Sequence, residues 1–217
     1  MPSLDAMISV ALAGLSLSAT PGPSMLYVLS RTVGQSRAAG LASALGLCLG
    51  GIVLAVATAL GLAAVFETSG WMVTALRYVG SAYLIWLGLD MIRSAKAGAQ
   101  MTLDVEKVRQ KSFSSIIWQG VLVEVLNPKT ILFFALFLPP FINAGDAQAA
   151  GVSVTMQLLV LGALVPLTAI PSDLVVAYMG GTMTKIINRE RAMRKSMAWA
   201  GGLILIGIAI NLHLQIL

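Results

Sequence analysis

The chain has 217 residues, of which 58% are hydrophobic and only 11% are charged, and its mean hydropathy is +0.88. Soluble domains carry about 25% charged residues, so the composition excludes an ordinary water-soluble protein. Apolar segments recur from one end of the chain to the other and leave no room for a separate soluble module. We therefore predict one membrane domain over residues 1–217.

Six segments are long and apolar enough to cross a bilayer, for which a helix needs about 20 residues. They lie near residues 6–30, 38–66, 71–92, 113–141, 152–183 and 196–216. None of them reduces to an amphipathic stripe, which disfavours helices lying on the membrane surface. Asp5 precedes the first segment and no basic residue does, unlike a signal peptide. The sequence predicts an all-α polytopic membrane protein with six transmembrane helices.

The basic residues indicate which helix ends face the cytoplasm. Of the 14 Lys and Arg residues, 12 lie in three of the connections: Arg31 and Arg37; Arg93, Lys96, Lys107, Arg109 and Lys111; and Lys185, Arg189, Arg191, Arg194 and Lys195. The other two connections carry only Glu67 and Asp146 as charges. The positive-inside rule then places the basic connections in the cytoplasm and both termini on the periplasmic side. The net charge of +5 thus reports topology, and nucleic-acid binding is disfavoured because aromatic residues are not interleaved with the charges.

Proline interrupts the first and fourth segments, at TPGP (residues 20–23) and at NPK (residues 127–129). Proline has no N–H, so the carbonyls of Leu17 and Glu124 lose their helical donors. In hydrocarbon an unsatisfied backbone group costs several kcal/mol, and such backbone survives only where it is buried in protein or lines a wet cavity. Because Thr and Asn are good N-caps, we predict that half-helices start at Thr20-Pro21 and Asn127-Pro128. A plain proline kink packed against a neighbour is the alternative.

Each half of the chain begins with a broken span, which suggests a duplication. The half-repeats, roughly 1–92 and 113–217, would hold three helices each and would be joined by the basic cytoplasmic loop 93–112. Since three is odd, the halves would insert in opposite orientations, as in inverted-repeat transporters. The two half-helix starts would then meet near the midplane and offer free N–H groups to a carboxylate. We predict a 3+3 inverted repeat with broken first helices.

Three ionisable residues lie well inside the predicted spans: Glu124 and Lys129 around the second break, and Asp173 in the fifth span. Charges at this depth are costly and usually functional. Glu124 and Lys129 could neutralise each other as an ion pair, or Lys129 could strengthen an anion site while Glu124 faces an ammonium group. Asp173 follows Pro171, so it could cap a break in a discontinuous or tilted helix, or exchange a proton. Asp173 and Glu124 are the candidates for proton coupling.

Missing residue types exclude several kinds of chemistry. Cys48 is the only cysteine and His213 the only histidine, so the sequence offers no metal cluster, disulfide pair or catalytic triad. It also lacks the glycine motifs that bind nucleotides. We expect no cofactor, no metal and no enzymatic activity. Gly46 and Gly50 form a small-residue pair in the second span, which would pack either inside the fold or across a homodimer interface.

Five segments, in order along the chain, carry a family resemblance. They are TPGPSMLYV from residue 20, GLASALGLCLGG from residue 40, YVGSAYLIWLGLDMIRS from residue 78, NPKTILFFALFLPPF from residue 127 and PSDLVVAYMGG from residue 171. Together they resemble the LysE/RhtB family of bacterial amino-acid exporters, and the match covers essentially the whole chain.

This resemblance implies a multi-pass inner-membrane exporter of amino acids or close derivatives, driven by the proton motive force. The family positions that it marks for substrate binding are Thr20, Pro21, Gly22, Pro23, Asn127, Pro128, Lys129 and Asp173. Glu124 is not a family position, and its role rests on local physics. A passive or ion-conducting channel that uses the same broken helices as its pore is the alternative function.

Overall fold

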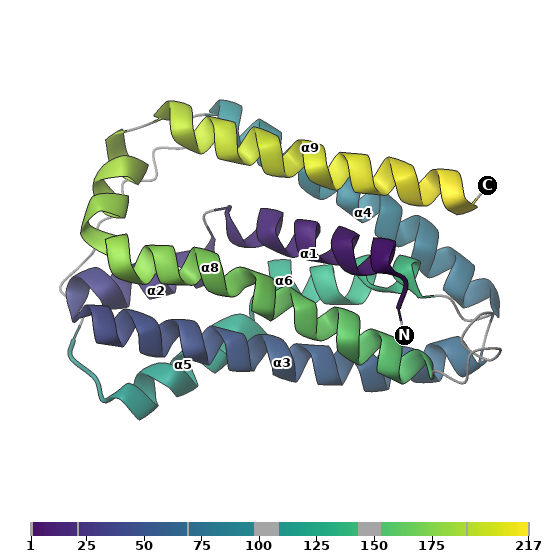
Figure 1. The fold of residues 1–217 in the computed structure, drawn as a ribbon, viewed down its shortest axis with the longest axis horizontal. Helices are drawn as coiled ribbons and strands as arrows, with labels where there is room; N and C mark the ends of the chain where they lie inside the picture. The colour runs from purple at the N-terminus through teal and green to yellow at the C-terminus, as the bar shows by residue number, and fades with distance from the viewer. Residues whose placement is uncertain are drawn as a thin grey trace.

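The structure is a computed structural model that describes residues 2–20, 22–68, 70–97, 109–142, 153–189 and 191–216. These residues form helices and contain no strand, which confirms the all-α class. The helices run lengthwise in one bundle (Figure 1). They are α1 (Leu4–Ser18), α2 (Pro23–Gly34), α3 (Arg37–Thr68), α4 (Gly70–Ala97), α5 (Phe113–Val125), α6 (Pro128–Leu132), α8 (Val154–Arg189) and α9 (Arg191–Ile216), with a π-helical turn η1 (Phe133–Phe137) and a 3-10 turn η2 (Pro139–Phe141) after α6.

The first predicted span is a bent pair, in which α1 and α2 meet at 54°. The sequence predicts that the half-helix after this break starts at Thr20-Pro21. This prediction is wrong, because α2 begins at Pro23 with Gly22 as its N-cap. The hydroxyl of Thr20 instead donates back to the Ser16 carbonyl at 2.7 Å and closes the end of α1. A glycine N-cap has no side chain to bond the first-turn N–H groups, so α2 begins without a side-chain cap.

The fourth predicted span is also bent, by 50° between α5 and the helical segment Pro128–Phe141. Here the predicted start is confirmed: Pro128 is the first helical residue, and the Asn127 side chain accepts the Lys129 N–H at 3.1 Å. The Asn127 N–H donates to the Glu124 carbonyl at 3.1 Å, which gives that carbonyl a donor in place of the missing proline N–H.

The fifth predicted span is one continuous helix. α8 runs through Pro166 and Pro171, so the discontinuous helix considered for this span is wrong, and Asp173 does not cap a break. Gly51 of α3 leaves room for the Pro166 ring, since a Cβ at Gly51 would lie 2.6 Å from the Pro166 Cβ.

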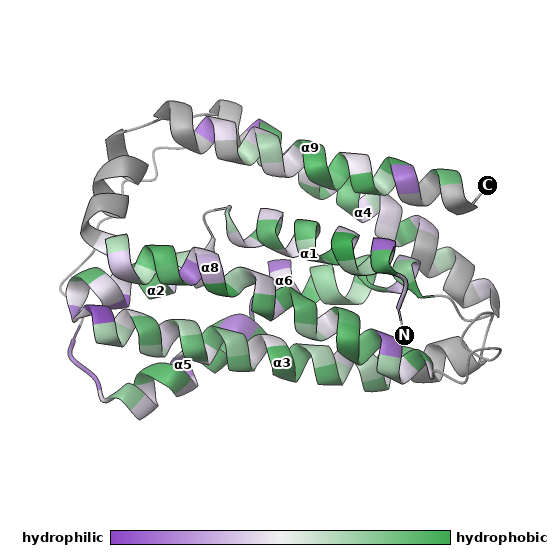
Figure 2. Cartoon of the chain, in the orientation of Figure 1, coloured by the Kyte–Doolittle hydropathy of each residue, from purple (hydrophilic) through white to green (hydrophobic). Residues whose placement is uncertain are grey.

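The number of membrane spans stays a prediction. By length and composition, α3 over Arg37–Leu62 and α8 over Val154–Gly180 can each cross a membrane, and the two bent pairs raise the number to four. α4 and α9 correspond to the remaining two predicted spans, and within the described residues α9 contains a shorter apolar helix, Ala198–Asn211. Hydrophobic residues cover most of these helices, with hydrophilic patches near the start of α6 and within α8 (Figure 2).

Aromatic and aliphatic side chains from most of the helices form the main core. The Phe133 and Phe137 rings stack at 4.3 Å between centroids, and Phe137 contacts Phe141 at 4.8 Å. After η1 the chain continues into the 3-10 turn Pro139–Phe141, where Pro139 and Pro140 supply no N–H, and it becomes extended at Ile142. The largest fully buried side chains are Phe133, Phe134, Phe137, Leu29, Leu84, Ile116, Leu138, Ile142, Leu158, Leu161, Leu205 and Val10.

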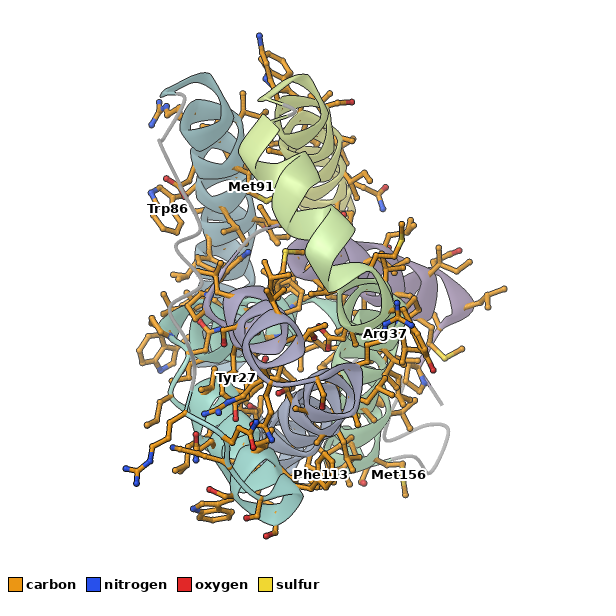
Figure 3. All side chains as sticks on the ribbon, turned by 90° about the vertical axis from the view of Figure 1, so that its left-hand side faces the viewer. Tyr27, Arg37, Trp86, Met91, Phe113 and Met156 are labelled. Carbon is orange, nitrogen blue, oxygen red and sulfur yellow. The ribbon has the colours of Figure 1, made fainter. Side chains whose placement is uncertain are left out.

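The two ends of the bundle carry different segments. The start of α1 and the end of α9 lie at one end, together with the end of α3 and the start of α4 (Figure 1). The α2–α3 junction, the start of α5 and the end of α8 lie at the other. Figure 3 looks along the bundle from this second end, where Arg37 and Phe113 are labelled.

Glycine seams bring the helices into backbone contact. A Cβ at Gly46 would lie 2.3 Å from the Ile117 carbonyl oxygen of α5, and a Cβ at Gly120 would lie 3.0 Å from the Gly46 Cα. The Gly46 pair therefore packs inside the fold, and this face is not available to a homodimer. α4 and α9 make a second seam, in which Gly88 and Gly202 each approach the other's carbonyl oxygen.

We expect Gly46→Ala to destabilise the protein by about 1–3 kcal/mol, because the new methyl group meets backbone that cannot rotate away. Gly61→Ala, in the same helix, is the control, since a Cβ there has nothing within 4 Å. Alanine's helix propensity should make this control neutral or stabilising by up to about 1 kcal/mol. Thermal unfolding in detergent checks both variants, and a Gly46→Ala protein as stable as wild type would contradict the seam.

Candidate functional site

The two breaks lie side by side and border one cavity. The empty space is about 670 Å³, including its open mouth. The predicted site residues that line it are Thr20, Gly22, Pro23, Glu124, Asn127, Lys129 and Asp173. Pro128 is not among the lining residues, and Pro21 lies outside the described residues. The sequence-predicted residues of both breaks and of the fifth span therefore face a common space.

A network of polar side chains connects the two breaks around Glu124. The Ser24 hydroxyl, in the first turn of α2, donates to Glu124 Oε2 at 2.5 Å. The Thr130 hydroxyl, in the first turn of α6, donates to Oε1 at 2.9 Å. Asn127 Nδ2 donates to the Ser24 oxygen at 3.0 Å. Both oxygens of Glu124 thus have hydroxyl donors, one from each half of the chain.

Lys129 makes the second connection between the breaks. Its Nζ donates to the Leu17 carbonyl oxygen at 3.2 Å, across the cavity wall. The Leu17 carbonyl is the one that loses its helical donor at Pro21. The Lys129 ammonium therefore supplies part of the hydrogen bonding that the missing N–H would have given. Of the two alternatives considered for Glu124 and Lys129, the ion pair is not formed, because within the described chain the carboxylate accepts hydrogen bonds from Ser24 and Thr130 instead.

Asp173 differs from Glu124 in having no hydrogen bond or ion pair to any residue that the structure describes. Its carboxylate is half-buried on the cavity wall, in the middle of α8. Asp173 shares the wall of this cavity with Glu124 and Cys48. An unpaired acid in such a place is ready to bind a cation or a proton.

Sequence reasoning missed three residues at this site. Asp90 of α4 is exposed and does not line the cavity, but it is close enough to Lys129 for an electrostatic interaction. It lies near the end of an apolar segment, three residues before Arg93, where a charge attracts little attention. The hydroxyls of Ser24 and Thr130 were missed because Ser and Thr are common in membrane helices, and no sequence signal shows that both face Glu124.

The rest of the cavity wall is largely apolar. Leu47 comes from α3 and Phe134 from η1, while Val165, Pro166 and Ala169 come from successive turns of α8. A cavity with a few fixed polar groups on an apolar wall is the usual form of a small-molecule site. Within the described part of the chain, no group of His, Cys, Asp and Glu residues could hold a metal ion.

We expect Asn127→Ala to destabilise the protein by about 1–2 kcal/mol, because it removes both the cap on the Lys129 N–H and the donor to Ser24. Asn211→Ala, at an exposed position of α9, is the matched control and should change the stability little. The measurement is thermal unfolding of both variants in detergent. Equal stability of the two would show that Asn127 does not organise the second break.

The chain is similar to bacterial membrane proteins, two of which are named as amino-acid efflux proteins. The chain is 28% identical over 199 residues to the leucine efflux protein of Enterobacter sp. (strain 638), which covers 88% of this chain and 87% of the relative. It is 27% identical over 147 residues to the threonine efflux protein of Escherichia coli (strain K12), covering 67% and 71%. An uncharacterized membrane protein of Bacillus subtilis (strain 168) is 29% identical over 203 residues, covering 90% and 92%. No solved structure matches the chain significantly.

The family described as LysE type translocator matches residues 15–215. This range contains both helix breaks and all the described lining residues of the cavity except Gly14. The chain therefore belongs to the LysE type translocator family, whose members are transporters and not enzymes.

Proposed function

We propose that this protein is a secondary transporter that exports amino acids or close derivatives across the bacterial inner membrane, driven by the proton motive force. The observation that carries the proposal is one cavity between two broken helices, with an unpaired carboxylate, a lysine and an apolar wall. Membership of the family supports transport, and relatives named as leucine and threonine efflux proteins support an amino-acid substrate.

In this proposal the substrate carboxylate lies between the two breaks. The start of α2 supports this assignment because Gly22 offers no side-chain cap, so the first-turn N–H groups and the positive end of the helix dipole are available. Lys129 supports it as well, since among the described residues only the Leu17 carbonyl accepts one of its three N–H donors. Thr20, Gly22, Pro23 and Asn127 shape the same wall, and Pro21 and Pro128 act by breaking the helices.

Asp173 binds the substrate ammonium and the coupling proton in turn. A carboxylate holds either a proton or an ammonium ion, but the two compete for the same oxygens. Protonation from the outer side would release the substrate, and deprotonation on the inner side would allow the next one to bind. Glu124 is the second candidate for the proton, although its oxygens already accept two hydroxyl hydrogen bonds.

We also propose the six-span, 3+3 inverted-repeat arrangement. Two related contacts support it: Gly14 of the first span packs against α8, and Gly120 of the fourth span packs against α3. An inverted repeat relates these contacts, since it exchanges the first span with the fourth and the second with the fifth. In this topology the end of the bundle with the α2–α3 junction and the start of α5 faces the cytoplasm, and both termini are periplasmic.

Reconstitution tests the transport function. Purified protein in liposomes should move amino acids in a saturable manner and faster when a pH gradient is imposed. Empty liposomes set the background. Flux no faster than this background across a broad amino-acid panel would refute the proposal, and flux that neither saturates nor responds to pH would favour the channel alternative.

Asp173→Asn should abolish the response to the pH gradient, because an amide side chain, unlike a carboxylate, does not bind and release a proton in the pH range of such a gradient. Exposed Asp5→Asn at the start of α1 is the matched control and should transport as wild type does. The measurement is the initial rate with and without the gradient, on protein whose thermal unfolding matches wild type. Unchanged coupling in Asp173→Asn would remove this residue from the mechanism.

The topology can be tested with single cysteines in a Cys48→Ala background. A cysteine at exposed Ser3 should react with a membrane-impermeant maleimide added to whole spheroplasts, and one at exposed Lys111 should react only after the membrane is opened. The reverse pattern would place the termini in the cytoplasm.

A further inference from the structure

Three charged side chains line the cavity, and they differ in how far they are already paired. Glu124 accepts hydrogen bonds at both oxygens, Lys129 uses one donor, and Asp173 has no hydrogen bond or ion pair among the described residues. The hydrogen-bond and ion-pair partners that each group still lacks define the charges that a bound molecule has to supply. This argument rests on the proposed transport function and concerns the class of amino acid.

Both carboxylate oxygens of Glu124 already accept hydrogen bonds within the protein. Its two hydroxyl donors come from opposite halves of the chain, and Ser24 is itself held by Asn127. Thr130 and Asn127 are buried, at 4% and 5% exposed, so water does not readily replace them. A cation that sought the Glu124 carboxylate would have to displace hydroxyls that join the two breaks. Glu124 therefore contributes structure and offers little to a ligand.

Asp173 and Lys129 are left as one acid and one base. Asp173 lies on α8, and Lys129 lies at the start of α6 with two of its N–H donors free. The ammonium and carboxylate of one zwitterion would satisfy both. A second cation on the ligand would find no free acid among the other described lining residues, which are apolar side chains, hydroxyls, a thiol, the Asn127 amide and glycines.

The side chain of a bound amino acid would therefore lie against the apolar wall formed by Leu47, Phe134, Val165, Pro166 and Ala169. Burying an ammonium or guanidinium group against such a wall without a partner is strongly unfavourable. We propose that the cavity accepts α-amino acids with an uncharged, apolar side chain and excludes those whose side chain carries a positive charge, because Ser24 and Thr130 occupy Glu124, the only carboxylate besides Asp173 among the described lining residues.

Ligand-induced stabilisation of the purified protein tests this inference independently of transport, since a ligand that binds the folded state raises the midpoint of unfolding. The probes are leucine, and the pair norleucine and lysine, which share a carbon skeleton and differ in the terminal ammonium. Leucine and norleucine should stabilise the protein at concentrations at least about tenfold lower than lysine, and exchange rates in liposomes should follow the same order.

Removing the two hydroxyls should change the selectivity. In Ser24→Ala/Thr130→Val the Glu124 carboxylate loses both donors and becomes a free acid beside the cavity. This variant should gain stabilisation by lysine, while Ser30→Ala, whose hydroxyl donates to the Tyr27 carbonyl away from the cavity, should keep the wild-type order. Glu124→Gln, which supplies no free acid, should not gain lysine binding and gives a second measurement if the double variant is unstable.

The outcomes separate this inference from the proposed function. Wild-type protein that is stabilised by lysine as well as by norleucine would overturn the inference even if transport is observed. Loss of leucine binding in a folded Glu124→Gln protein would also overturn it, because Glu124 would then be a ligand for the substrate ammonium. Selective binding of leucine and norleucine without any flux would uphold the inference on the cavity and refute the transport proposal.

Discussion

The structure depends on one constraint: a carbonyl that loses its helical donor inside a bilayer must find another donor in the protein. Both broken spans meet this requirement locally, and the first also meets it across the cavity. The Asn127 N–H donates to the Glu124 carbonyl. The Leu17 carbonyl accepts the Thr20 N–H at 3.4 Å and the Lys129 ammonium at 3.2 Å. Because the Lys129 donor comes from the other half of the chain, satisfying one break also fixes the position of the second.

The same contacts explain why a charged cavity is tolerated here. Charges inside a membrane are costly unless other polar groups compensate them. Glu124 is compensated by the Ser24 and Thr130 hydroxyls, and Lys129 by a carbonyl and by the field of Asp90. Among the described residues that line the cavity, Asp173 is the one charge without such compensation, so a ligand or a proton changes the energy most at this position.

Close packing of α3 and α8 holds the walls of the cavity in place. Gly51 makes room for the Pro166 ring, and Gly162 brings α8 close to Ala55. The second pair, α4 and α9, packs through Gly88 and Gly202, and both helices also contact the bent spans. Met91 of α4 reaches the break from this side, since the Thr20 hydroxyl lies 3.9 Å from the Met91 sulfur. The breaks are thus enclosed by helices from both halves.

The sequence by itself determined the helical class, the two proline breaks, the cap at Asn127 and the intramembrane charges, because these follow from composition, from the missing proline N–H and from local hydrogen bonding. Only the tertiary structure decided that α2 starts at Pro23, that α8 is continuous through Pro171 and that Glu124 pairs with hydroxyls and not with Lys129. Those outcomes depend on partners distant along the chain, such as Ser24 and Glu124, which are 100 residues apart. The spacing of residues within one helix does not determine which distant donor forms a hydrogen bond with a carboxylate.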